Sequence, residues 1–261
     1  MKDLYYEYEK DLNCDLFITQ QKEYNGRLHF HRAFELAYII EGNAKYTVED
    51  QNFIVQSGDM FFSHRYYSHR CSDKLPHKKY VIAVPENFSL SLTMLLREET
   101  LPPLLSDKDF NRTLVPIINK LHKDKNLHPV VVKGYINVIF GSLFDHYSTV
   151  TVKPKNKNVS RIEKILLYLD AHYMQPLTSD EVALQLGYSN SYFSRLFNQC
   201  IGSSFNSYLN ALRLDKFEEL AALSPTKSIT ELAFECGFTS LATFYRAKHL
   251  RSLGLNHNNT D

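Results

Sequence analysis

Residues 178–197 read TSDEVALQLGYSNSYFSRLF, and residues 228–247 read SITELAFECGFTSLATFYRA. Each stretch opens on a hydroxyl residue, Thr178 or Ser228, that precedes a glutamate by three positions. This spacing is typical of a capping box, in which the hydroxyl caps a helix and the carboxylate bonds back to the cap. The sequence therefore predicts that one structural unit occurs twice, with a period of 50 residues.

A glycine turn follows each of these predicted short helices. Gly187 and Gly237 each precede an aromatic residue and then a serine or threonine. Beyond Gly187 the apolar residues recur at helical spacing, so a second amphipathic helix is expected after the turn. A short helix, a turn containing glycine and a second helix form a helix-turn-helix motif. We predict two such motifs, joined by a long helix that runs from Ser204 to Leu223.

The second helix of each motif is the predicted recognition helix, which would enter the major groove of DNA. Its apolar stripe is expected to be buried, which leaves a polar face for the DNA. Arginine can bridge the O6 and N7 atoms of guanine, and asparagine can pair with adenine. The residues predicted to contact DNA are Ser191, Ser194, Arg195, Asn198, Thr243, Tyr245 and Arg246.

Residues 160–247 resemble the DNA-binding domain of the AraC family of bacterial transcription regulators. The residues that carry the resemblance are Ala183, Gly187, Tyr188, Ser189, Phe193, Ser194, Arg195, Phe197, Gly202, Ile229, Ala233, Gly237, Phe238, Phe244 and Arg246. The resemblance implies a sequence-specific transcription regulator that binds double-stranded DNA as a homodimer, with RNA polymerase as a further candidate partner. It leaves the operator, and the choice between activation and repression, open.

The second motif departs from this pattern at its end. Lys248 falls where the family has a buried phenylalanine, and the usual family ending is replaced by RAKHLRSLGLNHNNTD. Because burying an unpaired lysine is costly, we expect Lys248 to turn to solvent or the helix to fray after Arg246. The resulting hypothesis is that DNA is bound mainly through residues 190–198, with a shortened footprint.

The N-terminal region, residues 12–90, predicts β-structure. Short segments rich in β-branched and aromatic residues alternate with turn signals such as Gly42-Asn43. Several short strands at this spacing are typical of a small barrel or a two-sheet jelly roll. Residues 1–90 are expected to form this barrel as an effector domain, residues 91–148 a helical dimerisation segment, and residues 149–159 a linker. Residues 160–261 are the predicted helical DNA-binding domain, which opens on a capping box at Ser160. The predicted fold is α+β in two domains.

Three histidines and a glutamate form a second candidate site. His29, His31 and Glu35 have the spacing HxHxxxE, and His69 follows in a later strand. The pattern resembles the motifs of the cupin family, which supplies the usual effector domain of AraC-family proteins. Side chains two apart on a strand point to the same side, so His29 and His31 can share one target. The four groups could line a small-molecule pocket or hold Fe, Mn, Ni or Zn.

Other residues depart from the cupin motifs, because His64 and Tyr66 stand where a proline and a glycine are usual. We therefore expect no bound metal or other cofactor. We favour an unidentified small-molecule effector in the barrel, and a domain without an effector is the alternative. The helical segment 91–148 contains a stripe that is apolar on more than one face and predicts a dimer contact. By resemblance, AraC-family effector domains often dimerise through this segment.

Composition agrees with a globular regulator. The chain has 261 residues, 44% of them hydrophobic, and a formal net charge of +1, so DNA affinity has to come from placed side chains. No run approaches the roughly 20 apolar residues that span a bilayer. The four cysteines, Cys14, Cys71, Cys200 and Cys236, form no CxxC pair and predict reduced thiols in a cytoplasmic protein. The alternative function is a metal-dependent cupin enzyme; we expect a regulator and no catalysis.

Overall fold

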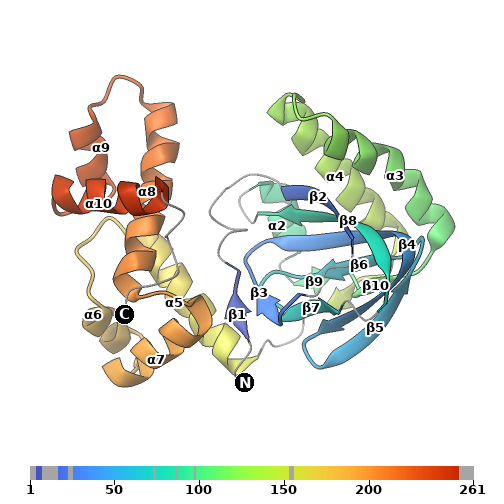
Figure 1. Ribbon diagram of the computed structural model, residues 1–261, viewed down its shortest axis with the longest axis horizontal. Helices are drawn as coiled ribbons and strands as arrows, with labels where there is room; N and C mark the ends of the chain where they lie inside the picture. Colours follow the sequence, from blue (N-terminus) through green and yellow to red (C-terminus); the bar gives the residue numbers. More distant parts are fainter. Residues whose placement is uncertain are drawn as a thin grey trace. The chain divides into compact units, whose positions relative to one another are not determined.

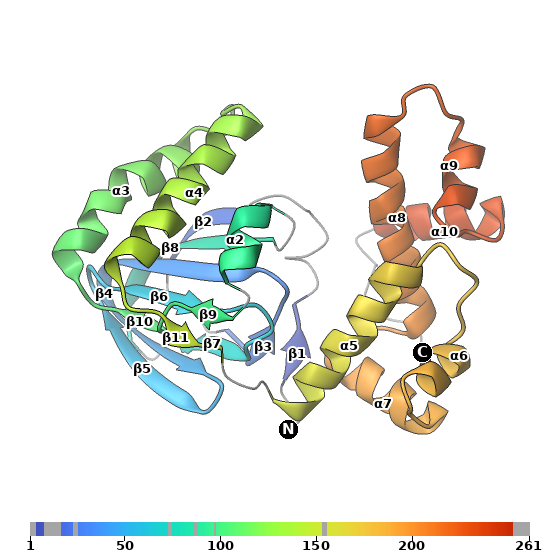
Figure 2. The ribbon, with the colours of Figure 1, turned by 180° about the vertical axis from the view of Figure 1, so that it is seen from behind.

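The computed structural model describes residues 4–7, 17–22, 26–72, 75–85, 88–96, 98–152 and 156–252. The chain divides into two compact units, Met1–Val159 and Ser160–Asp261. The first unit combines strands with helices, and the second is helical, as predicted (Figures 1 and 2).

One long strand, β4 (Phe34–Val48), organises the β-rich unit. Its first half pairs with β6 (Met60–Ser63) and β8 (His77–Val84), and its second half pairs with β5 (Gln51–Gln56) and β7 (His69–Ser72). The same strand therefore belongs to two sheets. Apolar side chains from both sheets meet in one interior cluster, where the Tyr46 and Phe61 rings stack with their centroids 3.8 Å apart.

The predicted turn at Gly42-Asn43 is wrong, because β4 runs through it. The pairing of β4 with β8 shifts register between Ile39 and Glu41, and Gly42 has a φ of 75°. A Cβ atom at Gly42 would lie 2.1 Å from the carbonyl oxygen of Pro76. The glycine thus permits the irregularity and the close approach of a neighbouring strand, which is a common role for glycine in strands.

The remaining strands extend both sheets. β2 (Phe17–Lys22) pairs with β8, β3 (His29–Phe30) with β7, and β1 (Tyr5–Tyr6) runs parallel to β3. β10 (Leu104–Leu105) pairs with β6. Across the described part of the chain, the path of paired strands ends at β1 and β10. The cupin-like unit is therefore two sheets that share β4 rather than a ring of strands.

Three helices follow the strands: α2 (Leu90–Leu95), α3 (Lys108–Lys123) and α4 (Pro129–His146). Buried residues of α3 and α4 share an apolar cluster with the outward-facing side of β4, β6 and β8.

The segment predicted to be helical also contains two strands, β9 (Glu99–Thr100) and β10. Within the predicted linker, β11 (Val150–Thr151) pairs with β9. Short strands of two residues carry no periodic pattern, and so the sequence did not show them.

The helical unit contains α6 (Ser179–Gln185), α7 (Asn190–Ile201), α8 (Phe205–Leu223), α9 (Ile229–Glu235) and α10 (Leu241–Ser252). Both predicted capping boxes are confirmed at Thr178 and Ser228. The long helix α8 begins after its cap Ser204, also as predicted. Figures 1 and 2 show α8 between the α6–α7 pair and the α9–α10 pair.

The predicted capping box at Ser160 is wrong. Helix α5 (Lys157–His172) begins three residues earlier, so Ser160 lies inside its first turn. The carboxamide oxygen of Asn156 accepts a hydrogen bond from the Asn158 backbone N–H at 2.9 Å. Asn156 therefore supplies a cap ahead of the serine, which is a role that asparagine fills as well as serine does.

The first of the two outcomes expected at the end of the second recognition helix is confirmed. Lys248 is exposed, as predicted, but α10 does not end at Arg246 and continues to Ser252. Arg251 in its last turn donates a hydrogen bond to the Ala211 carbonyl oxygen at 3.0 Å and forms an ion pair with Asp215. A charged anchor to α8 thus holds the end of the helix. Residues 253–261 lie outside the described part of the chain.

Three of the four cysteines are buried and free of disulfides: Cys71, Cys200 and Cys236. Cys14 lies outside the described residues. Burial raises the pKa of the Cys200 thiol and of the Cys236 thiol to about 11. Both therefore stay protonated at neutral pH and behave as small apolar side chains.

Among the described helices, none is long and apolar enough to cross a bilayer.

Candidate DNA interface and ligand site

The predicted DNA contacts on α7 lie on the side of the helix away from its core. Phe193 and Phe197 are fully buried, whereas Ser191, Arg195 and Asn198 are exposed. Ser194 is half-buried, and its hydroxyl donates to Asn190 Oδ1 at 3.2 Å. The helix therefore presents one positive charge and several hydrogen-bonding groups on a single face, as base recognition requires.

Tyr192 is a neighbour of this face that the sequence analysis did not single out. The Arg195 guanidinium carbon lies 5.9 Å from the Tyr192 ring centroid, and Arg161 of α5 donates to the Tyr192 hydroxyl at 2.7 Å. A guanidinium near an aromatic face gains a cation–π attraction and loses rotamer freedom. Tyr192 thus helps to orient Arg195. An aromatic residue three positions before an arginine on a helix is the signal that could have indicated it.

The predicted contacts on α10 form the corresponding face of the second motif. Tyr245 and Arg246 are exposed, and Phe244 is fully buried. Thr243 is half-buried, with its Oγ1 3.0 Å from the hydroxyl of Ser240. Thr243 therefore helps to close the first turn of the helix, while Tyr245 and Arg246 are available to DNA.

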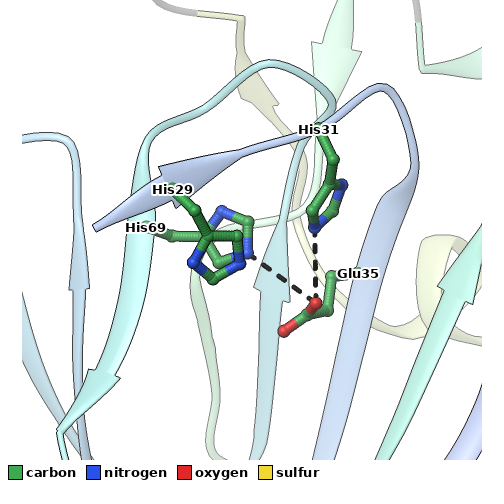
Figure 3. Close-up of side chains that lie close together, drawn as sticks. All are labelled: His29, His31, Glu35 and His69. Atoms are coloured by element: carbon green, nitrogen blue, oxygen red, sulfur yellow. Dashed lines mark ion pairs between the residues drawn. The ribbon is translucent and has the colours of Figure 1, made fainter. Parts of the chain in front are cut away.

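The structure brings the four predicted ligand residues of the β-rich unit together. His29 on β3 and His69 on β7 are direct cross-strand partners, His31 follows β3, and Glu35 lies on β4. All four are buried, and one donor atom of each lies within 4.8 Å of the others. The His31 and His69 Nε2 atoms lie 3.4 and 3.7 Å from the same Glu35 oxygen (Figure 3). A fifth group, Glu7, has an oxygen 3.3 Å from His29 Nε2.

Each of the three imidazoles is fixed by a backbone carbonyl on its far side. The Nδ1 atoms of His29, His31 and His69 lie 2.8, 2.9 and 2.9 Å from carbonyl oxygens of nearby residues in the chain. A carbonyl oxygen only accepts hydrogen bonds, so Nδ1 carries the hydrogen in each ring. In a neutral imidazole the other nitrogen, Nε2, then carries the lone pair that can accept a hydrogen bond. All three Nε2 atoms belong to the cluster around Glu35.

Polar side chains continue next to this cluster in the interior. The buried Lys79 ammonium donates to the Tyr46 hydroxyl at 3.0 Å. Burial, together with Cys71 and Glu35 nearby, raises the pKa of the Tyr46 phenol well above its usual range. Tyr46 is therefore a neutral hydrogen-bonding group at physiological pH. A fully buried lysine is uncommon, and here its partner is the Tyr46 hydroxyl.

A separate cavity of about 440 Å³ opens in the same unit. Its volume lies in the range of roughly 300–1,000 Å³ that small-molecule sites occupy. The Thr100 hydroxyl, which lines it, is buried and has no hydrogen-bond partner among the described residues. The four clustered residues do not line this cavity; its walls include Val48, Phe62, His64, Tyr67, Leu101 and Val150. The sequence analysis missed the cavity, because its walls come from loops and short strands without periodic pattern.

Family comparisons agree with both halves of this architecture. The AraC-like ligand binding domain matches residues 16–107, and a helix-turn-helix domain matches residues 182–250. The chain belongs to the AraC family of transcription regulators. This AraC-family protein is a DNA-binding transcription regulator with an N-terminal ligand-binding domain. The match supports the regulator over the metal-dependent enzyme that the sequence left as the alternative.

Several curated relatives align with the AraC-family chain. The transcriptional activator RhaS of Klebsiella pneumoniae is 24% identical over 223 residues, which are 80% of this chain and 78% of that protein. The right origin-binding protein of Escherichia coli is 35% identical over 86 residues, which are 33% of this chain and 29% of that protein. Among solved structures, the AraC-like transcriptional activator CuxR is 16% identical with a TM-score of 0.46, covering 85% of this chain and 82% of that one.

Proposed function

We propose that this AraC-family regulator binds specific operator sequences as a homodimer and responds to a ligand held in its β-rich unit. The observation that carries the proposal is the pair of exposed faces on α7 and α10, each backed by buried phenylalanine and each led by a capped helix. One motif alone has limited specificity, whereas two motifs on one domain can read two neighbouring stretches of the major groove.

Sequencing of DNA fragments selected by the purified full-length protein tests this function. We expect one enriched motif that contains two short conserved blocks, because each recognition helix would read one block. Selection that yields no enriched motif at low salt would contradict sequence-specific binding. A motif with a single block would instead restore the hypothesis that residues 190–198 provide most of the contact.

Arg195 is the residue with the clearest expected role in base recognition. Replacing Arg195 with alanine should weaken binding to the selected site by about 1–3 kcal/mol, roughly fivefold to 150-fold, and relax the preference at one base pair. Fluorescence anisotropy with the selected site and a scrambled duplex measures both effects. Arg112→Ala is the matched control, because Arg112 is an exposed arginine on α3 of the other unit. Equal losses on both duplexes would show that Arg195 contacts only phosphates.

Helix α4 supplies the surface that we propose for the homodimer. Ile136, Ile139 and Phe140 are buried against the β-rich unit, but Val131 and Val138 are exposed. A Cβ atom at Gly134 or Gly141, on the same helix, would meet nothing within 4 Å. Exposed valines beside glycines are typical of helix–helix association, in which small residues permit close approach.

A charge placed on this helix face should disrupt the homodimer. Val138→Asp is expected to shift the protein from dimer to monomer by at least tenfold in the dissociation constant, because an unpaired carboxylate would be buried in the interface. Sedimentation velocity over a concentration series measures the shift. The matched control is Ile54→Asp on β5, since Ile54 is 49% exposed and Val138 is 50% exposed. A wild-type protein that is monomeric throughout would refute the interface.

We further propose that the regulator contacts RNA polymerase and acts in the cytoplasm. Both follow from regulation of transcription in bacteria, and neither requires a catalytic step. The ligand contacts that we propose are His29, His31, Glu35 and His69, and the separate cavity of the same unit offers room for an organic effector. The proposal is supported by the convergence of the four side chains in the interior of the ligand-binding domain. His69 reaches this place although it is distant in sequence from the other three.

A further inference from the structure

We infer that the separate cavity of the β-rich unit binds an uncharged, largely apolar organic molecule that carries a carbonyl or hydroxyl group. The inference rests on the proposed response to a ligand. It names the class of that ligand and a place for it outside the histidine cluster. The cavity has a volume of about 440 Å³, which a small organic molecule can fill. The class of the ligand follows from the residues that line the cavity.

The buried part of the cavity wall is mainly apolar. Phe62, Tyr67 and Leu101 line the cavity and are buried, and Pro102 and Pro103 add two further apolar rings. Walls of apolar and aromatic side chains with few polar groups are typical of small-molecule sites. Apolar surface leaves water when it meets such walls, and so a largely apolar molecule gains affinity here.

The Thr100 hydroxyl gives this wall a polar point. Thr100 is 3% exposed, and its Oγ1 has no hydrogen-bond partner among the described residues. Buried polar groups in proteins nearly always have a hydrogen-bond partner, which is a protein atom, a water molecule or a ligand. A ligand carbonyl accepts a hydrogen bond from a hydroxyl, and a ligand hydroxyl either accepts or donates one. A ligand oxygen that replaces a water molecule at Thr100 would reproduce its hydrogen bond.

The charges around the cavity disfavour an anionic ligand. Among the described residues that line it, none is a lysine or an arginine, whereas Glu49 and Asp50 both contribute carboxylates. The two ring nitrogens of His64 lie 3.1 and 2.8 Å from the carbonyl oxygens of Arg65 and Leu96, so both face the backbone. A carboxylate ligand would therefore leave water without gaining a cationic partner, which is costly.

The two carboxylates do not favour a cationic ligand at the buried wall either. Glu49 Oε1 accepts hydrogen bonds from the Ser68 backbone N–H at 2.7 Å and from the Ser68 hydroxyl at 3.1 Å. Asp50 is exposed to solvent. An ammonium group next to Thr100 and Leu101 would therefore lose its hydration without a carboxylate directed at it. An uncharged molecule avoids both penalties.

The same cavity reaches the segment that leads into helix α5. Val150 and Thr151 of β11 line it, and Val150 is the cross-strand partner of Thr100 on β9. Asn156, which caps α5, is a further wall residue. A molecule in the cavity would contact both strands of this pair. It should therefore slow hydrogen exchange of the backbone N–H groups at residues 100–101 and 150–152.

Fluorescence titration of the full-length protein with prodan, an uncharged naphthalene ketone, tests the site. We expect blue-shifted emission that saturates at one molecule per chain. Acetylnaphthalene, also an uncharged ketone, should displace prodan. Naphthoate, which has a carboxylate in place of the ketone, should displace it at least about tenfold more weakly. Absence of saturable prodan binding, or equal displacement by the two competitors, would overturn the inference.

Thr100→Val removes the hydroxyl and nearly preserves the shape of the side chain. It should weaken prodan binding by about threefold to tenfold, because one hydrogen bond to the ligand is lost. The melting temperature of the protein without prodan should stay equal or rise, because the removed hydroxyl has no partner among the described residues. A lower melting temperature with unchanged affinity would show a purely structural role and contradict the inference. Thr113→Val is the matched control, since Thr113 is exposed on α3 and lies outside the cavity.

Val150→Trp tests the place of binding in a second way. Val150 is 40% exposed at the cavity wall, so the larger ring should occupy part of the volume and weaken prodan binding by about tenfold or more. Ile54→Trp on β5 is the control, because Ile54 is 49% exposed and does not line the cavity. Unchanged binding in both Val150→Trp and Thr100→Val would place the dye on another surface and refute the site.

The outcome is independent of the test of DNA recognition. Selected DNA sequences report on the helical unit, and prodan fluorescence reports on the β-rich unit. A protein that selects a DNA motif but binds no prodan would retain sequence-specific DNA binding and lose this inference. A protein that binds prodan in the cavity but selects no DNA motif would give the opposite result.

Discussion

Replacing Gly237 with alanine should destabilise the helical unit by about 3 kcal/mol or more, whereas Gly187→Ala should cost only about 1 kcal/mol. The two glycines occupy the same place in the repeat, with φ values of 85° and 75°. A Cβ atom at Gly237 would lie 2.5 Å from the carbonyl oxygen of Tyr173 and 2.8 Å from Met174 Cα. At Gly187 nothing lies within 4 Å. Only the second motif therefore adds a backbone collision to the conformational strain.

Urea denaturation followed by circular dichroism at the helical wavelength measures the difference. Gly187→Ala serves as the control, since it isolates the penalty for a side chain at positive φ. Equal losses for the two variants would mean that the segment at Tyr173 moves aside freely. In that case the close approach at Gly237 would contribute nothing to the stability of the domain.

Replacing Arg213 with methionine should cost about 3 kcal/mol of stability in the same unit. Arg213 on α8 is 6% exposed, and it donates to the carbonyl oxygens of Tyr173 and Gln175 at 2.9 Å each. Hydrogen bonds from a charged group contribute roughly 1.5–3 kcal/mol each, and the two buried carbonyls would lose these donors. Methionine retains the apolar stem of the side chain but also removes the guanidinium carbon that lies 6.0 Å from the Phe238 ring centroid, so the loss would report on the hydrogen bonds together with this contact.

The matched control is Arg195→Met, because Arg195 is exposed on α7 and should change stability by less than about 0.5 kcal/mol. A stable Arg213→Met variant would show that water replaces both hydrogen bonds. The double variant with Gly237→Ala provides a further check. Both changes act at the Tyr173 carbonyl, so their effects should not add.

The sequence was most informative where a pattern repeats or has a fixed spacing. Both capping boxes and the helix beyond Ser204 were predictable, because short-range backbone chemistry determines helix ends. The grouping of His29 and His31 was predictable from the period of a strand, and the structure adds His69 and Glu35 as expected. Paired exposed faces on α7 and α10 follow from helical periodicity in the same way.

The remaining features depend on contacts between distant parts of the chain. The passage of β4 through Gly42 could not be distinguished from a turn, since both use a glycine at positive φ. The anchor of Arg251 on α8 has no local signal, because its partners are about 40 residues away in sequence. The carbonyls behind the three histidines are also invisible in the sequence. They determine the tautomer, and thereby which ligand the cluster suits.

The double use of β4 has a consequence for how the two units fold. Phe34 must find Val84, and Glu35 must find both Ser63 and Ala83, before the first half of the strand is paired. In the helical unit, α6 and α7 or α8 and α9 are neighbours in sequence that contact each other directly. Contacts between distant residues form slowly because long loops must close first. The β-rich unit leaves the ribosome first, yet the helical unit should be the faster of the two to reach its native structure.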